Sequence, residues 1–260
     1  MKIFMKKKID TIILNRLRKI TNEVNIDPDW MKKEVVEIIV VAILLLSMFL
    51  LSYKASEYVN STHVETQKNR TIVLDAGHGG DDPGKIGVNG AVEKDINLAV
   101  TKRVQSLLEA NDITVIMTRE DDDGMYDRTA SNKKVQDMRK RLELIQVSNP
   151  ALVVSIHQNS YHEESIHGAQ VFYYKTSIEG KEAAELMQRQ LILRVDKENK
   201  REEKANASYY LLKKTEVPII IVECGFLSNQ NEAGLLVSTE YQEKLAWAIH
   251  MGIMEYLNRK

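Results

Sequence analysis

With 260 residues, the chain is long enough for one full domain and an additional segment. Its formal net charge of −1 gives no basic excess, so nucleic acid is not expected as a partner. The single cysteine, Cys224, excludes an internal disulfide and a zinc site built from several thiolates.

An uncharged apolar run near the amino terminus predicts a transmembrane helix. It extends over residues 38–53, and with the valines just before it approaches the roughly 20 residues that cross a bilayer. Lys and Arg outnumber acidic residues ahead of it, which by the positive-inside rule keeps the amino terminus in the cytoplasm and exports the rest. We therefore expect a basic tail (1–34), a single-pass anchor (35–53) and a polar linker (54–70).

A cleaved signal peptide is the alternative to an anchor. Tyr53 and Lys54 stand where small residues would be needed for cleavage before Ala55, and the preceding tail is long for a signal. We favour an uncleaved anchor, which places the protein in the cell membrane with its carboxyl-terminal domain outside.

The stretch TIVLDAGHGG, residues 71–80, predicts a short buried strand followed by a glycine-rich turn. His78 would then lie at the carboxyl end of a strand, where open α/β sheets bind their ligands. The glycines allow a sharp bend and leave room beside the imidazole. Taken alone, a glycine turn with an incidental histidine explains the stretch about equally well.

Three further polar residues stand at the ends of apolar elements. Glu93 opens a helix, His157 ends one strand-like run and Glu223 ends another. Taken alone, Glu93 would be explained by the helix dipole, which favours an acid in the first turn. Together with His78, however, these residues supply the two histidines and one glutamate that commonly bind a catalytic zinc ion.

Helical and strand patterns alternate along the rest of the chain. Helices are expected over 93–110, 135–147, 181–195, 209–214 and 241–257, and strands over 72–74, 113–118, 151–157, 169–174 and 219–223. The charged run 197–204 is expected to be solvated surface. The pattern predicts a single α/β domain (71–260) with a mostly parallel, twisted sheet covered by helices on both faces.

Two other histidines, His162 and His167, compete with His157 as ligands. They stand in a polar loop, whereas a strand end is held rigidly by its sheet. We therefore expect His157 to be the ligand.

Four motifs resemble those of a known family. They are DAGHGG (75–80), Glu93, SIHQN (155–159) and ECGFLSN (223–229). In this order they resemble the zinc-dependent N-acetylmuramoyl-L-alanine amidases of the third amidase type, from residue 71 to the carboxyl terminus. Within that family, the short anchored form is similar to the germination-specific branch, which acts on the spore cortex.

The resemblance implies that His78, Glu93 and His157 bind Zn²⁺ and that Glu223 is the catalytic residue. Zinc with an open position would polarise an amide carbonyl and lower the pKa of bound water toward ~7, while Glu223 would transfer a proton to the leaving nitrogen. The substrate would be peptidoglycan, cleaved between the lactyl group of muramic acid and L-alanine. The resemblance also raises an activating protein as a partner.

Two positions depart from the family pattern. Ser160 stands where many relatives have Ala, and Cys224 where they have an aliphatic residue. Cys224 alternates with the preceding glutamate along its strand, so we expect it to be a buried packing residue that points away from the site. Asp75 and Asn159 are each expected either to orient an imidazole or to cap a turn.

Two other functions remain open at this point. One is a zinc peptidase or aminoacylase that acts on another amide. The other is an anchored wall-binding protein that has lost catalysis, although the presence of all four polar site residues argues against it.

Overall fold

The computed structural model describes residues 15, 19, 28–66 and 70–260. The chain divides into two units, Met1–Gln67 and Lys68–Lys260. In the first unit, α2 (Pro28–Thr66) is one helix, and its segment Val35–Ser56 is long and apolar enough to cross a membrane. Most of the expected basic tail lies outside the described residues.

The expected linker differs from the structure in its conformation. Residues 54–66 continue α2 as helix and are not irregular. They contain neither glycine nor proline, so no residue in this stretch breaks the helix that begins before it. Residues 67–69 of that linker lie outside the described part of the chain.

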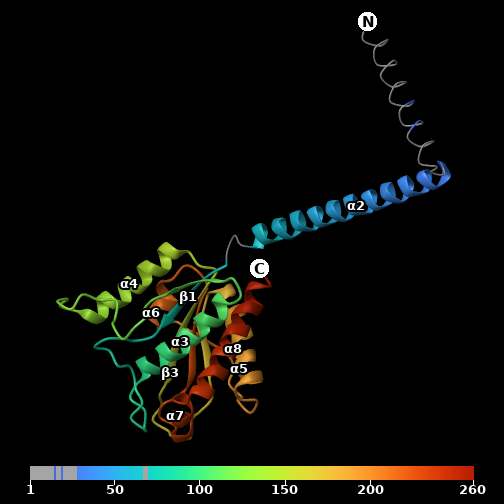
Figure 1. The fold of residues 1–260 in the computed structure, drawn as a ribbon. Coiled ribbons are helices and arrows are strands. Elements are labelled where there is room, and N and C mark those ends of the chain that lie inside the picture. Colours follow the sequence, from blue (N-terminus) through green and yellow to red (C-terminus); the bar gives the residue numbers. More distant parts are fainter. Residues whose placement is uncertain (1–14, 16–18, 20–27, 67–69) are drawn as a thin grey trace. The chain divides into compact units, whose positions relative to one another are not determined.

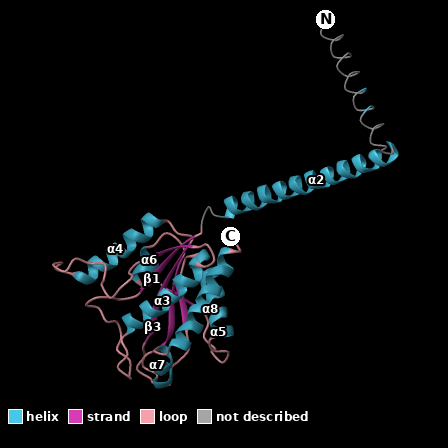
Figure 2. Cartoon of the chain, in the orientation of Figure 1, coloured by secondary structure: helices cyan, strands magenta, loops and turns pink. Residues whose placement is uncertain are grey.

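The second unit is built on a β-sheet with helices packed against it (Figures 1 and 2). The sheet has six strands in the order β2-β1-β3-β6-β4-β5. The four strands from β2 to β6 are parallel, whereas β4 is antiparallel to β6 and β5 is parallel to β4. The mostly parallel sheet is thus confirmed. The strands are β1 (Thr71–Ala76), β2 (Thr114–Met117), β3 (Leu152–Asn159), β4 (Gln170–Tyr174), β5 (Lys204–Asn206) and β6 (Ile219–Phe226).

The edge strand β5 was not predicted, because it begins at the end of the charged run 197–204. It has only three residues, and none of them is fully buried. An edge strand of this kind carries no apolar alternation by which the sequence could reveal it.

Helices cover both faces of the sheet, as the sequence predicts. Side chains alternate between the faces along each strand, so that Ile72 and Leu74 of β1 pack in one apolar cluster and Val73 packs in the other. The first cluster includes residues of α3 (Glu93–Glu109), α5 (Ile178–Arg194), α7 (Gln230–Leu236) and α8 (Thr239–Leu257). The second includes residues of α4 (Lys133–Ser148) and α6 (Tyr210–Lys214).

A buried ion pair joins α4 to the end of β1. Arg141 Nη1 lies 2.5 Å from Asp75 Oδ1, and the two side chains are only 2% and 1% exposed. The same guanidinium donates hydrogen bonds to the carbonyls of Ala76 and His78, while the second Asp75 oxygen accepts one from Ser155 on β3. Burial raises the pKa of Asp75, but the charge of Arg141 and the Ser155 hydrogen bond outweigh it and lower the pKa to about 2. Arg141 therefore fixes the backbone at the end of β1 and at the start of the turn that follows it.

Replacing Arg141 by methionine should destabilise the fold strongly. Arg141→Met leaves the Asp75 carboxylate buried without its partner, and removing one member of a buried ion pair costs about 3–5 kcal/mol. We expect the free energy of unfolding to fall by that amount in urea titrations of the detergent-solubilised chain, followed by circular dichroism.

The matched control is Arg139→Met on the same helix. Arg139 is 62% exposed, and its ion pair in the described part of the chain is with Glu143, one turn further along, so a much smaller loss is expected. Equal losses in the two variants would contradict the structural role assigned to the buried pair.

Candidate active site

A cleft of ≈ 910 Å³ opens at the carboxyl ends of β1, β3 and β6. Its walls include residues of α4 and α6 together with the glycine-rich turn after β1. Ile221, which lines the cleft and has the same strand parity as Glu223, packs in the apolar cluster that includes residues of these two helices. The site residues that the sequence predicts all border this cleft, namely His78, Glu93, His157 and Glu223.

The turn after β1 brings its histidine close to β3. A Cβ added at Gly77 would lie only 2.2 Å from the His157 ring, so the ring can occupy its place only because residue 77 is glycine. His78 itself has φ 63°, a left-handed conformation that is uncommon for a residue other than glycine. The hydrogen bond of 2.6 Å from Arg141 to the His78 carbonyl helps to hold this strained backbone.

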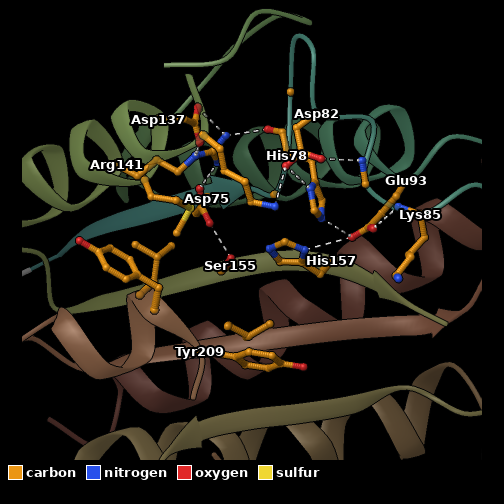
Figure 3. Close-up of a pocket in the computed structure, with 18 of the residues that line it drawn as sticks. Asp75, His78, Asp82, Lys85, Glu93, Asp137, Arg141, Ser155, His157 and Tyr209 are labelled. Carbon is orange, nitrogen blue, oxygen red and sulfur yellow. Dashed lines mark hydrogen bonds and ion pairs between the residues drawn. The ribbon is translucent and has the colours of Figure 1, made fainter. Parts of the chain in front are cut away.

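One carboxylate oxygen of Glu93 joins the two histidines (Figure 3). Glu93 Oε1 lies 3.2 Å from Nε2 of His78 and 3.0 Å from Nδ1 of His157. The two rings are 5.0 Å apart and nearly perpendicular, with an interplanar angle of 80°. In the part of the chain that the structure describes, this is the one group of three such side chains close enough to hold a metal ion.

Glu93 is a buried anion. Its side chain is 2% exposed, and its second oxygen accepts a hydrogen bond of 2.8 Å from the backbone N–H of Lys85. Burial raises the pKa of Glu93, but hydrogen bonds to His157 and His78 outweigh it and hold the pKa well below the ordinary value. The carboxylate therefore keeps its charge, as a metal ligand requires.

A carboxylate that the sequence reasoning missed orients His78. Asp82 Oδ2 lies 3.1 Å from the Nδ1 atom of His78, on the opposite side of the ring from Glu93. Burial lowers the pKa of His78, but the hydrogen bonds and charges of Glu93 and Asp82 raise it above its ordinary value. A carboxylate at Nδ1 fixes the ring and leaves Nε2 facing the cluster, which is a frequent arrangement around metal-binding histidines.

The two residues expected to orient an imidazole or to cap a turn do not bond to a histidine ring. Asp75 is occupied by Arg141, Ser155 and Thr118, and it links strands beneath the cleft. Asn159 Oδ1 accepts the backbone N–H of the next residue at 2.8 Å, which is a local turn contact. The signal that could have identified Asp82 is its position four residues after His78, within the same turn.

Glu223 is placed next to the cluster by the register of two strands. It is the direct partner of His157 across the parallel pair β3 and β6. It is 8% exposed, and its Oε2 atom is buried with no hydrogen-bond partner among the described residues. Burial is the main influence on the pKa of Glu223 and raises it to about 7. The charge of Glu93 adds to this increase, whereas the charge of His157 opposes it. A carboxyl group with this pKa can both accept and donate a proton near neutral pH.

The neighbouring Cys224 is a buried packing residue, as expected. It belongs to the apolar cluster on the α3 and α8 side of the sheet, whereas Glu223 borders the cleft. The predicted alternation of Glu223 and Cys224 between the two faces of the sheet is confirmed.

The loop histidines lie apart from the cluster. His162 is 71% exposed and contacts Glu163, and the Nδ1 atom of His167 lies 2.9 Å from the Ser165 carbonyl. The structure thus brings His157, and neither loop histidine, to Glu93.

The residues present fit a metal ion of the zinc type. Two imidazole nitrogens and one carboxylate oxygen lie within 4.8 Å of one another, and this donor set matches three-ligand catalytic zinc sites. The Oε2 atom of Glu223, which has no hydrogen-bond partner among the described residues, is not part of this set, and Glu223 pairs with His157 across the neighbouring strands.

Known proteins are similar to this chain over the domain that contains the cleft. The family described as N-acetylmuramoyl-L-alanine amidase matches residues 72–255. The germination-specific N-acetylmuramoyl-L-alanine amidase of Bacillus subtilis (strain 168) is 36% identical over 194 residues, which make up 74% of this chain and 81% of that protein.

Two solved structures have the same fold. The CwlD amidase from Clostridioides difficile, solved in complex with the GerS lipoprotein, is 44% identical with a TM-score of 0.72, covering 74% of this chain and 100% of that one. The N-acetylmuramoyl-L-alanine amidase AmiC2 of Nostoc punctiforme is 32% identical with a TM-score of 0.64, covering 73% and 97%.

The resemblance seen in the four sequence motifs is thereby confirmed. The matched region includes the whole histidine and glutamate cluster as well as Glu223, and it covers more than half of the chain. The chain therefore belongs to the N-acetylmuramoyl-L-alanine amidase family.

Proposed function

We propose that this protein is a zinc-dependent amidase that hydrolyses the bond between the lactyl group of muramic acid and L-alanine in peptidoglycan. One observation carries the proposal. Glu223 has a buried oxygen with no hydrogen-bond partner among the described residues, and it lies on the strand next to His157, where two histidines and a glutamate converge in an open cleft. Family membership supports the choice of substrate.

His78, Glu93 and His157 would hold the zinc ion. When bound there, zinc polarises the amide carbonyl and acidifies water. Asp82 would retain the proton on Nδ1 of His78, so that the Nε2 lone pair faces the ion. The Lys85 backbone N–H would hold the Glu93 oxygen that faces neither histidine.

Glu223 would carry the proton that the reaction moves. At Oε2 it takes a proton from the attacking water, whose oxygen bonds to the amide carbon. The same carboxyl group then gives the proton to the nitrogen as the carbon–nitrogen bond breaks, which releases the lactyl carboxylic acid and a peptide with a free amine; the acid then ionises in water. Burial raises the pKa of Glu223 above that of an exposed carboxyl group, and this favours a group that both accepts and returns the proton.

We further propose a location and a cellular role. The apolar segment Val35–Ser56 supports a single-pass anchor with the catalytic domain outside the membrane. Similarity to the germination-specific amidase of Bacillus subtilis supports a role in maturation of the spore cortex. The complex of the Clostridioides difficile amidase with a lipoprotein supports an activating partner protein.

The first test separates the candidate histidines. His157→Ala should remove zinc from the folded domain, because it deletes one of the three ligand side chains. His162→Ala and His167→Ala are the matched controls and should keep zinc per protein near the wild-type value, measured by elemental analysis. Zinc loss in a loop variant, with zinc retained in His157→Ala, would overturn the ligand assignment.

The second test separates metal binding from chemistry and tests the proposed reaction. Wild-type protein should release stem peptides from purified muropeptides, detected by mass spectrometry. Glu223→Gln should keep its zinc while turnover falls by roughly 10²–10⁴-fold, the usual loss on removing a general base. Glu93→Gln should instead lose zinc, and added zinc should restore part of its activity.

Two results of this test would count against the proposal. If Glu223→Gln lost zinc and regained activity on metal addition, the roles of the two glutamates would have to be exchanged. Cleavage of free peptides in place of muropeptides would point to a zinc peptidase.

The third test concerns membrane topology. Protease added outside intact cells should digest the chain beyond Lys54 and spare an epitope tag at the amino terminus, because the basic tail stays in the cytoplasm. A cytoplasmic protein that remains intact serves as the control. Cleavage of the tag would refute the orientation, and release of a domain that starts near Ala55 would indicate a cleaved signal.

A further inference from the structure

A buried asparagine contacts both Glu93 and the turn that carries His78. Asn97 lies one helical turn after Glu93 on α3 and is wholly buried. Its Nδ2 atom donates to the carbonyl of Gly77 at 3.1 Å and to Glu93 Oε1 at 3.4 Å. The side-chain amide of Asn97 thus connects α3, which carries Glu93, to the backbone just before His78.

A buried glutamine sets the direction of that amide. Gln158 Nε2 donates to Asn97 Oδ1 at 3.1 Å, so the NH₂ group of Asn97 has to face Gly77 and Glu93. The backbone N–H of Gln158 also donates to Glu93 Oε1, at 3.1 Å. Gln158 directly follows His157 on β3 and is 2% exposed.

These contacts connect all three ligand-bearing segments. The chain of hydrogen bonds runs from the residue after His157, through Asn97, to the carbonyl before His78, and it contacts Glu93 twice. Donors to Glu93 Oε1 restrict where its carboxylate can point. Hydrogen bonds of this kind to ligating carboxylates typically change metal affinity by 10–100-fold.

We propose that Asn97 is a positioning residue, oriented by Gln158, which holds the Glu93 carboxylate and the His78 turn in the arrangement that binds zinc. The proposal rests on the proposed function, in which Glu93 is a metal ligand. Asn97 does not act on the substrate, and its effect passes through Glu93 and through the carbonyl of Gly77.

If Asn97 and Gln158 had a purely structural role, their replacement would change fold stability and not zinc affinity. A buried amide pair that only satisfies polar groups would stabilise the fold and leave zinc affinity unchanged. Thr101 provides the matched control, because it is wholly buried one turn further along α3. Its hydroxyl donates at 2.6 Å to the backbone carbonyl of Asn97, and no hydrogen bond joins it to Glu93 in the described structure.

The experiment compares Asn97→Leu, Gln158→Met and Thr101→Val in the full-length chain in detergent. Zinc dissociation constants are measured by competition with a chromophoric chelator, and the stability of each metal-free protein by urea unfolding. Asn97→Leu should raise the zinc dissociation constant by about 10–100-fold. Gln158→Met should raise the zinc dissociation constant by a smaller factor. In this variant Asn97 keeps its amide but loses the hydrogen bond from Gln158 that orients it. Thr101→Val should bind zinc like the wild type while losing stability.

The outcomes separate this inference from the proposed function. If Asn97→Leu does not fold, Gln158→Met provides the test, because it leaves both contacts of Asn97 with Glu93 and Gly77 possible. Wild-type affinity in the folded Asn97 and Gln158 variants, or an equal loss in Thr101→Val, would refute the positioning role alone. Failure of the wild-type chain to bind zinc would refute the proposed function, and this inference with it.

Discussion

The buried ion pair between Asp75 and Arg141 is the contact on which the site depends. Placing two charges in the interior costs several kcal/mol per ion, and only close pairing with further hydrogen bonds offsets that cost. Arg141 meets this condition by donating to Asp75 and to the carbonyls of Ala76 and His78. The consequence is that α4, β1 and the turn after β1 form one rigid corner, in which His78 is held in a left-handed conformation.

Because side chains alternate along the strands, one face of the sheet supplies residues to the cleft and the other face supplies residues to the larger apolar core. Asp75, His157 and Glu223 border the cleft, while Cys224 and the other residues of opposite parity build the core with α3, α5, α7 and α8. Glu93 reaches the same cleft from the first turn of α3. The cluster therefore forms at the edge where the two layers meet, and a one-residue change of register in β3 or β6 would remove a site residue from the cleft.

Two glutamates in one cleft have opposite electrostatic character. Both are buried, but Glu93 accepts hydrogen bonds from two imidazoles and backbone N–H groups, which hold its pKa well below the ordinary value. Glu223 has a buried oxygen with no donor in the described structure, and its pKa rises to about 7. Environments that separate the pKa values of two carboxyl groups in this way commonly separate their roles, and the proposed mechanism uses Glu93 as a permanent anion and Glu223 as the proton carrier.

The sequence by itself determined the mostly parallel α/β domain and the four residues at the cleft. Apolar periodicity located the long helices and central strands, and the carboxyl ends of parallel strands necessarily meet at one edge. Only the tertiary structure decided that Asp82 and not Asp75 contacts an imidazole, and that Asn97 and Gln158 support Glu93. The physical reason is that periodicity reports which face of an element is buried, whereas hydrogen-bond partners depend on side chains that meet from distant parts of the chain. Asp75 could not be assigned from sequence because its partner, Arg141, lies 66 residues away, on the helix α4 that packs against this face of the sheet.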